Sequence, residues 1–244
     1  MPELTADRRG AIALTKKEEI RGLIKAIGIV PVVRASSPHQ ARFAAEAVLL
    51  GGIPIVEITM TVPRAIVVIS ELVRSSPEVL VGAGTVLDAE AARQCVDAGA
   101  QFIVTPGLDA ATAEFAANSQ VLLMMGALTP TEVITAWKAG ADFVKLFPCG
   151  NLGGPNYIKA LRGPLPHVPL VPTGGVCLDN AADYIRAGAA ALGVGGELIL
   201  KSALESCNSE PIRELAHRFV NAVKNARDQE IPKTGGTATE RGRA

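Results

Sequence analysis

Two ionisable residues lie inside stretches of sequence that are otherwise apolar. Lys145 lies in F-V-K-L-F-P, and Glu57 lies in I-V-E-I-T-M. A lone buried charge is costly unless it is paired or neutralised, so each residue needs a partner or a chemical role. An apolar wall disfavours an ammonium ion, and a neutral amine attacks ketones. Lys145 is therefore a candidate for forming a Schiff base, and Glu57 for moving the protons that this chemistry requires.

The elements that must position these residues alternate regularly. Eight short runs rich in Val, Ile and Leu have starts 19 to 27 residues apart, which leaves room for one helix and two loops between neighbours. Continuous apolar runs are typical of parallel strands covered on both faces. Eight such strands favour closure, so the sequence predicts an α/β fold, a (β/α)8 TIM barrel. The expected strands cover residues 28–34, 53–60, 80–86, 102–107, 121–128, 143–148, 170–175 and 191–196.

The segments between these runs carry helix start and stop signals. The tripeptide A-G-A recurs at 98–100, 139–141 and 187–189, each time just before a strand, and indicates one kind of helix-to-strand turn. Additional helices are expected at about 15–27, before the first strand, and at about 208–229. The start signals are Ser37-Pro38, Thr61-Val62-Pro63, Asp88, Asp109, Thr129-Pro130-Thr131-Glu132 and Asp179.

The length of 244 residues fits one barrel domain. We expect an N-terminal extension over 1–14, a single barrel over 15–229 and a tail over 230–244. The tail lacks apolar periodicity, which predicts disorder. The helix at about 15–27 is expected either to cap the bottom of the barrel or to pack alongside it.

Strand parity places Lys145 and Glu57 on defined faces. Lys145 shares a side of its strand with Phe143 and Phe147, and Glu57 shares one with Ile55 and Thr59. If both sets face the lumen, the lysine and the glutamate can meet at the end of the barrel that carries active sites. The alternative is a buried ion pair that only stabilises the barrel. We favour the functional interpretation.

Two glycine clusters follow the last two expected strands, Thr173-Gly174-Gly175 and Gly193-Val194-Gly195-Gly196. Loops at these positions often bind phosphate in barrels, because backbone N–H groups can converge on an anion. We therefore expect phosphate or carboxylate binding here, although tight turns alone would also use glycine. Arg34, at the end of the first expected strand, could hold a substrate carboxylate or make an ordinary surface salt bridge.

Composition argues against several other classes of protein. Lys and Arg balance Asp and Glu at 24 each, which disfavours nucleic-acid and anionic-membrane partners. No apolar stretch approaches the roughly 18 residues of a membrane span, and no signal-peptide pattern opens the chain, so we expect a cytoplasmic protein. The three histidines and four cysteines lack metal-ligand spacing, so we expect reduced thiols and no metal. Cys149 has no nearby general base and is interpreted as a bystander.

Five motifs occur in an order that resembles one known family. They are I-V-E-I-T at 55–59, V-G-A-G-T-V at 81–86, T-P-G at 105–107, V-K-L-F-P at 144–148 and V-P-T-G-G-V at 171–176. Together they resemble the 2-keto-3-deoxy-6-phosphogluconate (KDPG) aldolases, which include 2-keto-4-hydroxyglutarate (KHG) aldolases, over residues 18 to 225. The resemblance implies a class I aldehyde-lyase of the Entner–Doudoroff type, without metal or cofactor. It also implies a homotrimer that releases pyruvate and an aldehyde such as glyceraldehyde 3-phosphate from a 2-keto acid.

The resemblance also assigns roles to single residues. Lys145 looks like the Schiff-base lysine, and Glu57 looks like the general acid and base. The other positions resemble substrate-binding residues of the family: Thr85, Pro106 and Phe147 in the pyruvate pocket, Thr173 lining the site, and Gly174, Gly175, Gly195 and Gly196 at the phosphate end.

This chain departs from the family pattern at two places. Many relatives carry arginine where Thr61 stands, so Arg34 is expected to take over recognition of the carboxylate. Gly196 stands where a serine is common, and Glu197 follows it. Loss of a hydroxyl donor beside a new acid disfavours phosphate, which keeps a non-phosphorylated or galactonate-type substrate as an alternative. An isomerase or synthase on the same fold, and a non-catalytic barrel that binds keto acids or phosphate, also remain open.

Overall fold

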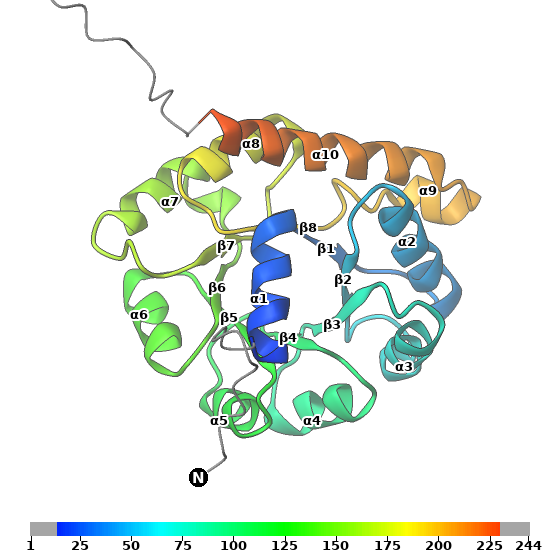
Figure 1. Cartoon of the computed structure of the whole chain (residues 1–244), viewed down its shortest axis with the longest axis horizontal. Coiled ribbons are helices and arrows are strands. Elements are labelled where there is room, and N and C mark those ends of the chain that lie inside the picture. The colour runs from blue at the N-terminus through cyan, green and yellow to red at the C-terminus, as the bar shows by residue number, and fades with distance from the viewer. Residues whose placement is uncertain (1–13, 230–244) are drawn as a thin grey trace, which may run out of the picture.

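The computed structural model describes residues 14–229, in which eight parallel strands form a barrel (Figure 1). Residues 1–13 of the expected extension and the expected tail lie outside this range. The strands neighbour one another in chain order from β1 to β7, and β8 pairs with β1. A bridge between Thr173 and Gly193 joins β7 to β8 and closes the ring. The strands are β1 (Ile29–Val33), β2 (Ile55–Thr59), β3 (Leu80–Gly84), β4 (Phe102–Val104), β5 (Leu122–Ala127), β6 (Phe143–Leu146), β7 (Leu170–Pro172) and β8 (Leu192–Val194).

Helices surround the strands and bury their outer face. Every residue of the eight strands is buried, which explains why their sequences are apolar without alternation. The predicted (β/α)8 barrel is thus confirmed. The helices are α1 (Lys16–Ile27), α2 (Pro38–Leu50), α3 (Ala65–Ser75), α4 (Ala89–Asp97), α5 (Ala110–Asn118), α6 (Pro130–Lys138), α7 (Pro155–Arg162), α8 (Leu178–Arg186), α9 (Lys201–Ser206) and α10 (Glu210–Asp228), with a 3-10 turn at Gly150–Leu152.

Four helices start at the residues that the sequence predicted as side-chain N-caps. Ser37, Asp88, Asp109 and Thr129 each accept a hydrogen bond from the backbone N–H three residues later. The A-G-A turns are also confirmed. Their central glycines have φ of 101° at Gly99, 91° at Gly140 and 97° at Gly188, the left-handed region in which glycine is unstrained.

Two predicted helix starts are wrong. The hydroxyl of Thr61 does not cap α3, because it hydrogen-bonds at 2.7 Å to the hydroxyl of Thr59; α3 begins only after Arg64, in left-handed conformation. α8 begins at Leu178, before Asp179, because the side chain of Asn180 accepts a hydrogen bond from the N–H of Cys177. Both bonds join residues two or three positions apart, but which side-chain bond forms depends on the conformation of the turn, and the residue types alone do not determine it. The short helix α9 was not predicted.

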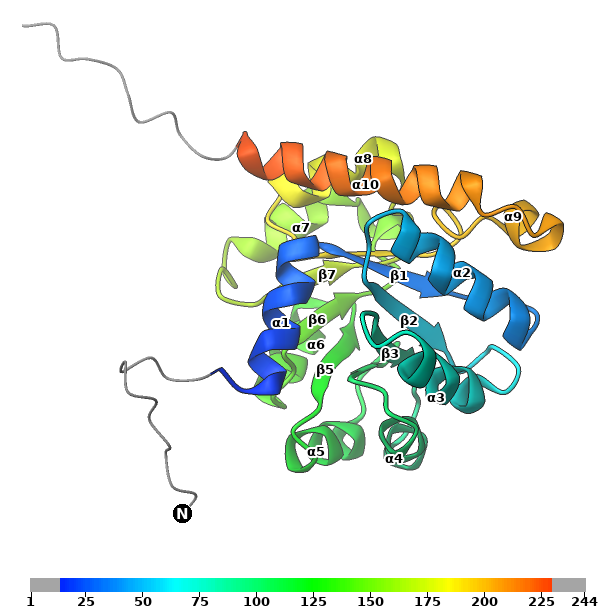
Figure 2. The same ribbon diagram turned by 45° about the vertical axis from the view of Figure 1, so that its right-hand side comes forward.

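Helix α1 crosses the end of the barrel at which the strands begin (Figures 1 and 2). Its apolar face buries Ile20 and Ile24, and Lys17 pairs at 2.9 Å with Asp142, the residue before β6. Of the two placements open for this helix, capping the bottom is therefore the one observed. The long helix α10 packs against α8 and α2 on the outside of the ring.

Candidate active site

The register of the strands shows which side chains share the lumen. Glu57 of β2 is level with Val32 of β1 and Gly82 of β3, and Lys145 of β6 is level with Gly126 and Val171. Register partners in parallel strands point to the same face of the sheet. Followed around the ring, this rule places Lys145 and Glu57 on the same inner face, as parity predicted.

The two ionisable side chains meet there. Lys145 Nζ lies 3.6 Å from Glu57 Oε1, and the two side chains are 4% and 2% exposed. Within residues 14–229, Glu57 Oε1 has no hydrogen-bond partner although it is buried. An unpartnered buried carboxylate oxygen is costly, and such atoms are typical of sites that a ligand completes. The pair can transfer a proton to or from a molecule held between its members.

Glycines on the inner face make room for this pair. A Cβ atom on Gly84 would lie 2.5 Å from Cγ of Glu57 and closer still to its carboxyl group. A Cβ on Gly126, the register partner of Lys145, would overlap the backbone of Pro106. Gly84 and Gly126 are thus site residues that sequence reasoning missed. The available signal was a glycine at inward parity next to a charged strand residue.

The T-P-G turn closes over the lysine side of the site. The hydroxyl of Thr105 donates to the carbonyl of Gly107 at 2.7 Å and accepts from the N–H of Gly126 at 3.0 Å. These bonds hold Pro106 above Gly126, beside the lysine strand. Thr85, which follows Gly84, has φ of 57°. Left-handed backbone in a β-branched residue is strained, and such strain gathers at functional sites.

The other predicted residues on β6 and β7 pack around the lysine. The ring centroid of Phe147 lies 5.8 Å from Lys145 Nζ, within cation–π range. A Cβ on Gly174 would lie 3.3 Å from that ring, so Gly174 forms the next part of the wall. Thr173, buried, packs over Gly193. The carbonyls of Thr173 and Gly174 accept hydrogen bonds from the turn after β6, which fixes the T-G-G segment, including Gly175, at this end.

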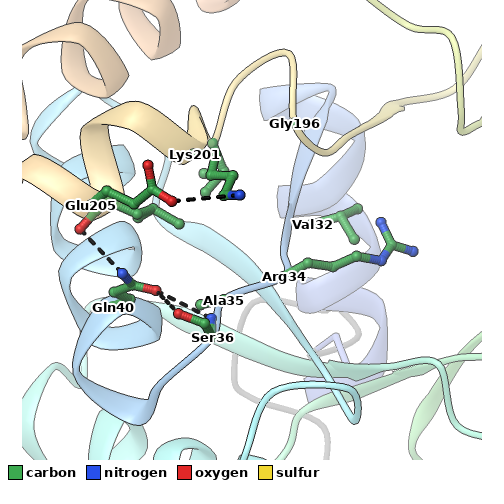
Figure 3. Close-up of a pocket in the computed structure, with 10 residues that line it drawn as sticks. Val32, Arg34, Ala35, Ser36, Gln40, Gly196, Lys201 and Glu205 are labelled. Carbon is green, nitrogen blue, oxygen red and sulfur yellow. Dashed lines mark hydrogen bonds and ion pairs between the residues drawn. The ribbon is translucent and has the colours of Figure 1, made fainter.

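Arg34 and Gly196 line a neighbouring pocket of about 330 Å³ (Figure 3). Arg34 Nη1 lies 3.6 Å from the position that a Cβ on Gly195 would occupy, so the ends of β1 and β8 adjoin. Among the described residues Arg34 forms no ion pair, which removes the ordinary salt bridge as its explanation. Lys145 and Glu57 do not line this pocket, but Val32, the register partner of Glu57, does. The pocket therefore includes a residue at the level of Glu57 and, beyond it, Arg34 and Gly196.

Cysteines and metal ligands play no visible part in this arrangement. Burial raises the pKa of Cys95 to about 11 and raises the pKa of Cys149. Over residues 14–229, no three His, Cys, Asp or Glu side chains gather closely enough to hold a metal ion. None of the described helices is long and apolar enough to span a membrane.

Comparison with known proteins identifies the same family as the motifs. The family model described as "KDPG and KHG aldolase" matches residues 20–215. The chain is 36% identical over 189 residues to the 2-dehydro-3-deoxy-phosphogluconate aldolase of Pseudomonas aeruginosa, covering 78% of this chain and 86% of that protein. It is 32% identical over 197 residues to the KHG/KDPG aldolase of Escherichia coli K12, covering 80% and 92%.

A solved structure agrees with both. The KDPG aldolase of Legionella pneumophila, with pyruvate captured as a covalent carbinolamine intermediate, superposes with a TM-score of 0.77 at 30% identity. The match covers 82% of this chain and 97% of that one. The fold, the ordered motifs and these matches lead to one conclusion: the chain belongs to the KDPG and KHG aldolase family.

Proposed function

We propose that this protein is a class I aldolase that cleaves a 2-keto-3-deoxy sugar acid, of the KDPG or KHG kind, to pyruvate and an aldehyde through a Schiff base on Lys145. The observation that carries the proposal is the buried approach of Lys145 Nζ to an otherwise unpartnered oxygen of Glu57. The names of the relatives support it, as does the pyruvate carbinolamine described for the Legionella enzyme.

The reaction needs one nucleophile and one mobile proton acceptor. A proton passes from Lys145 to Glu57, and the free amine adds to the C2 ketone to give a carbinolamine. Glu57 returns the proton to the carbinolamine hydroxyl, which leaves as water and gives an iminium ion, with Glu57 again ionised. Glu57 removes the proton of the C4 hydroxyl, the C3–C4 bond breaks, and its electron pair moves toward the iminium nitrogen. C4 leaves as an aldehyde. Protonation of the resulting enamine at C3 and addition of water to the imine release pyruvate and restore the amine.

The surrounding residues bind and orient the substrate in this proposal. Phe147, Pro106 and Thr85 hold the pyruvate half against the lysine, and Thr173 lines the same cavity. Arg34, which has no acidic partner among the described residues, binds the substrate carboxylate. The backbone N–H groups of the glycine turns, Gly174, Gly175, Gly195 and Gly196, hydrogen-bond to the far end of the substrate.

The remaining expectations belong to the same proposal. The enzyme works without a metal or cofactor, in the cytoplasm, on small molecules, as a single barrel domain over 15–229. A homotrimer follows from the family resemblance, and sedimentation equilibrium of the full chain tests it.

Trapping with borohydride tests the chemistry. Incubation of the full chain with pyruvate and sodium borohydride should leave a reduced pyruvate adduct, and peptide mass spectrometry should locate it on Lys145. Lys145→Arg should abolish the adduct, whereas Lys201→Arg, at an exposed lysine near the same mouth, should keep it. A folded wild-type protein without an adduct would overturn the proposal and favour a barrel of another reaction class or a non-catalytic binding protein.

A further inference from the structure

The pocket between β1 and β8 contains a second set of polar groups that the aldolase chemistry does not use. This pocket, called here the β1–β8 pocket, is lined by Val32, Arg34, Ala35, Ser36, Gln40, Gly196, Ile199, Lys201, Leu204 and Glu205. We infer that it selects a substrate whose far end carries free hydroxyl groups and no phosphate. The inference rests on the proposed function and names its substrate class.

The position of the pocket fits the far end of a chain-like substrate. Val32 is level with Glu57, and Arg34 follows two residues further toward the mouth on the same face of β1. In Figure 3, Arg34 extends to one side of the pocket, while Ser36, Gln40, Lys201 and Glu205 lie on the other. We therefore place the ketone of the substrate at Lys145, its carboxylate at Arg34 and its remaining carbons toward Ser36, Gln40 of α2, and Lys201 and Glu205 of α9.

Hydrogen bonds fix the orientation of the Ser36 hydroxyl. The N–H of Ser36 donates to Gln40 Oε1 at 3.2 Å, and the Ser36 hydroxyl donates to the same atom at 2.7 Å. Gln40 Nε2 donates to the carbonyl of Leu204 at 3.4 Å. A backbone N–H can only donate, so the glutamine atom facing it must be the oxygen, and that oxygen takes the serine proton. Ser36 therefore offers only lone pairs to the pocket.

An acceptor at this place discriminates between the two kinds of substrate. A hydroxyl group of a sugar acid can donate a hydrogen bond to Ser36 Oγ. The oxygens of an ionised phosphate are mainly acceptors, so they would be repelled by the lone pairs of Ser36 Oγ. Gln40 cannot simply flip to release the serine, because its NH2 group would then face the N–H of Ser36.

The charge of the lining leads to the same conclusion. Lys201 Nζ pairs with Glu205 Oε1 at 3.5 Å, which leaves Arg34 as the one unpaired charge among the residues that line the pocket. A single substrate carboxylate balances it. A phosphate would add about 1.5 to 2 further negative charges at neutral pH to a pocket lined by Glu205, and the exposed Glu197 directly follows Gly196 of the same lining.

Paired substrates test this selectivity. Retro-aldol kcat/KM of the full chain should be measured on 2-keto-3-deoxygluconate and 2-keto-3-deoxygalactonate and on their 6-phosphates, with pyruvate trapping run in parallel. We expect each free acid to exceed its phosphate by about tenfold or more. Equal or higher kcat/KM on the phosphates, or cleavage of none of the four with trapping intact, would overturn the inference and leave the aldolase proposal standing. Failure of trapping would instead overturn the proposed function itself.

A charge-neutral variant isolates the role of the pocket. Glu205→Gln removes the partner of Lys201, and the ratio of kcat/KM for phosphate over free acid should rise roughly tenfold. Glu210→Gln, which breaks the remote Arg213–Glu210 pair on α10, is the matched control and should leave the ratio unchanged. Ser36→Ala should raise KM for the free acids about three- to tenfold, with little change for the phosphates. An unchanged ratio in Glu205→Gln would show that the pocket does not select by charge.

Discussion

Gly84→Ala tests whether the position of the Glu57 carboxylate controls turnover. Ordinary van der Waals contact begins at about 3.4 Å, yet the new Cβ would lie 2.5 Å from Cγ of Glu57 and closer still to its carboxyl carbon and Oε1. The glutamate must therefore retreat by roughly 1 Å. Since Glu57 Oε1 now stands 3.6 Å from Lys145 Nζ, such a shift changes the geometry of proton transfer directly. A misplacement of this size costs about 100-fold in rate.

The assay separates this effect from simple overpacking. Pyruvate release, coupled to lactate dehydrogenase, gives kcat, and thermal unfolding gives Tm. For Gly84→Ala we expect kcat to fall about 100-fold and the free energy of unfolding to fall by about 1 to 3 kcal/mol. The control is Gly82→Ala, two residues earlier on the same face, where the Cβ would strike the ring of Phe102 instead. That variant should lose similar stability while keeping kcat within about tenfold. Normal kcat in a folded Gly84→Ala protein would refute the reasoning, because Glu57 would then act without its observed placement.

Two further predictions concern the candidate active site, and a third concerns the N-terminal cap of α6. Glu57→Gln should keep Tm within a few degrees but lower kcat about 100-fold, the usual scale for a proton-transfer group; near-normal turnover would remove Glu57 from the mechanism. Arg34→Met should raise KM for the keto acid about ten- to 100-fold, as loss of a charge-assisted hydrogen bond implies, and an unchanged KM would place the carboxylate elsewhere. Backbone hydrogen bonds, first that from Thr129, lower the pKa of Glu132 below 4.5. The contribution of the ionised carboxylate to stability is therefore present at neutral pH and is lost as the pH falls through the lowered pKa. In urea unfolding, the free energy of unfolding of Glu132→Gln should accordingly decrease less on acidification than that of the wild type.

The sequence predicted the barrel and the meeting of Lys145 with Glu57 because both depend on local patterns. Apolar runs identify strands buried on both faces, and a period of two fixes which side chains share a face. Residues as distant as 57 and 145 then meet once the ring closes, with no further information needed.

Features that depend on particular side-chain contacts, most of them between different elements, escaped prediction. Thr61 looked like a helix cap, but its hydroxyl is taken by Thr59. The orientation of Gln40 depends on the carbonyl of Leu204 in α9, a helix that was itself not predicted. Nothing in the sequence around Gly84 indicates that the side chain of Glu57 lies over it. For Gln40 and Gly84 the deciding neighbour lies in another element, whereas for Thr61 it is Thr59, two residues earlier at the end of β2.

The helix that seals the bottom of the barrel has a consequence for the order of events. Because α1 lies across the ends where the strands start, we expect the reactants, products and water of the proposed reaction to pass through the opposite end of the barrel. In the proposed reaction, the aldehyde formed by bond cleavage then stands between the covalently held three-carbon fragment and bulk solvent. We therefore expect the aldehyde to leave before water reaches the imine and releases pyruvate.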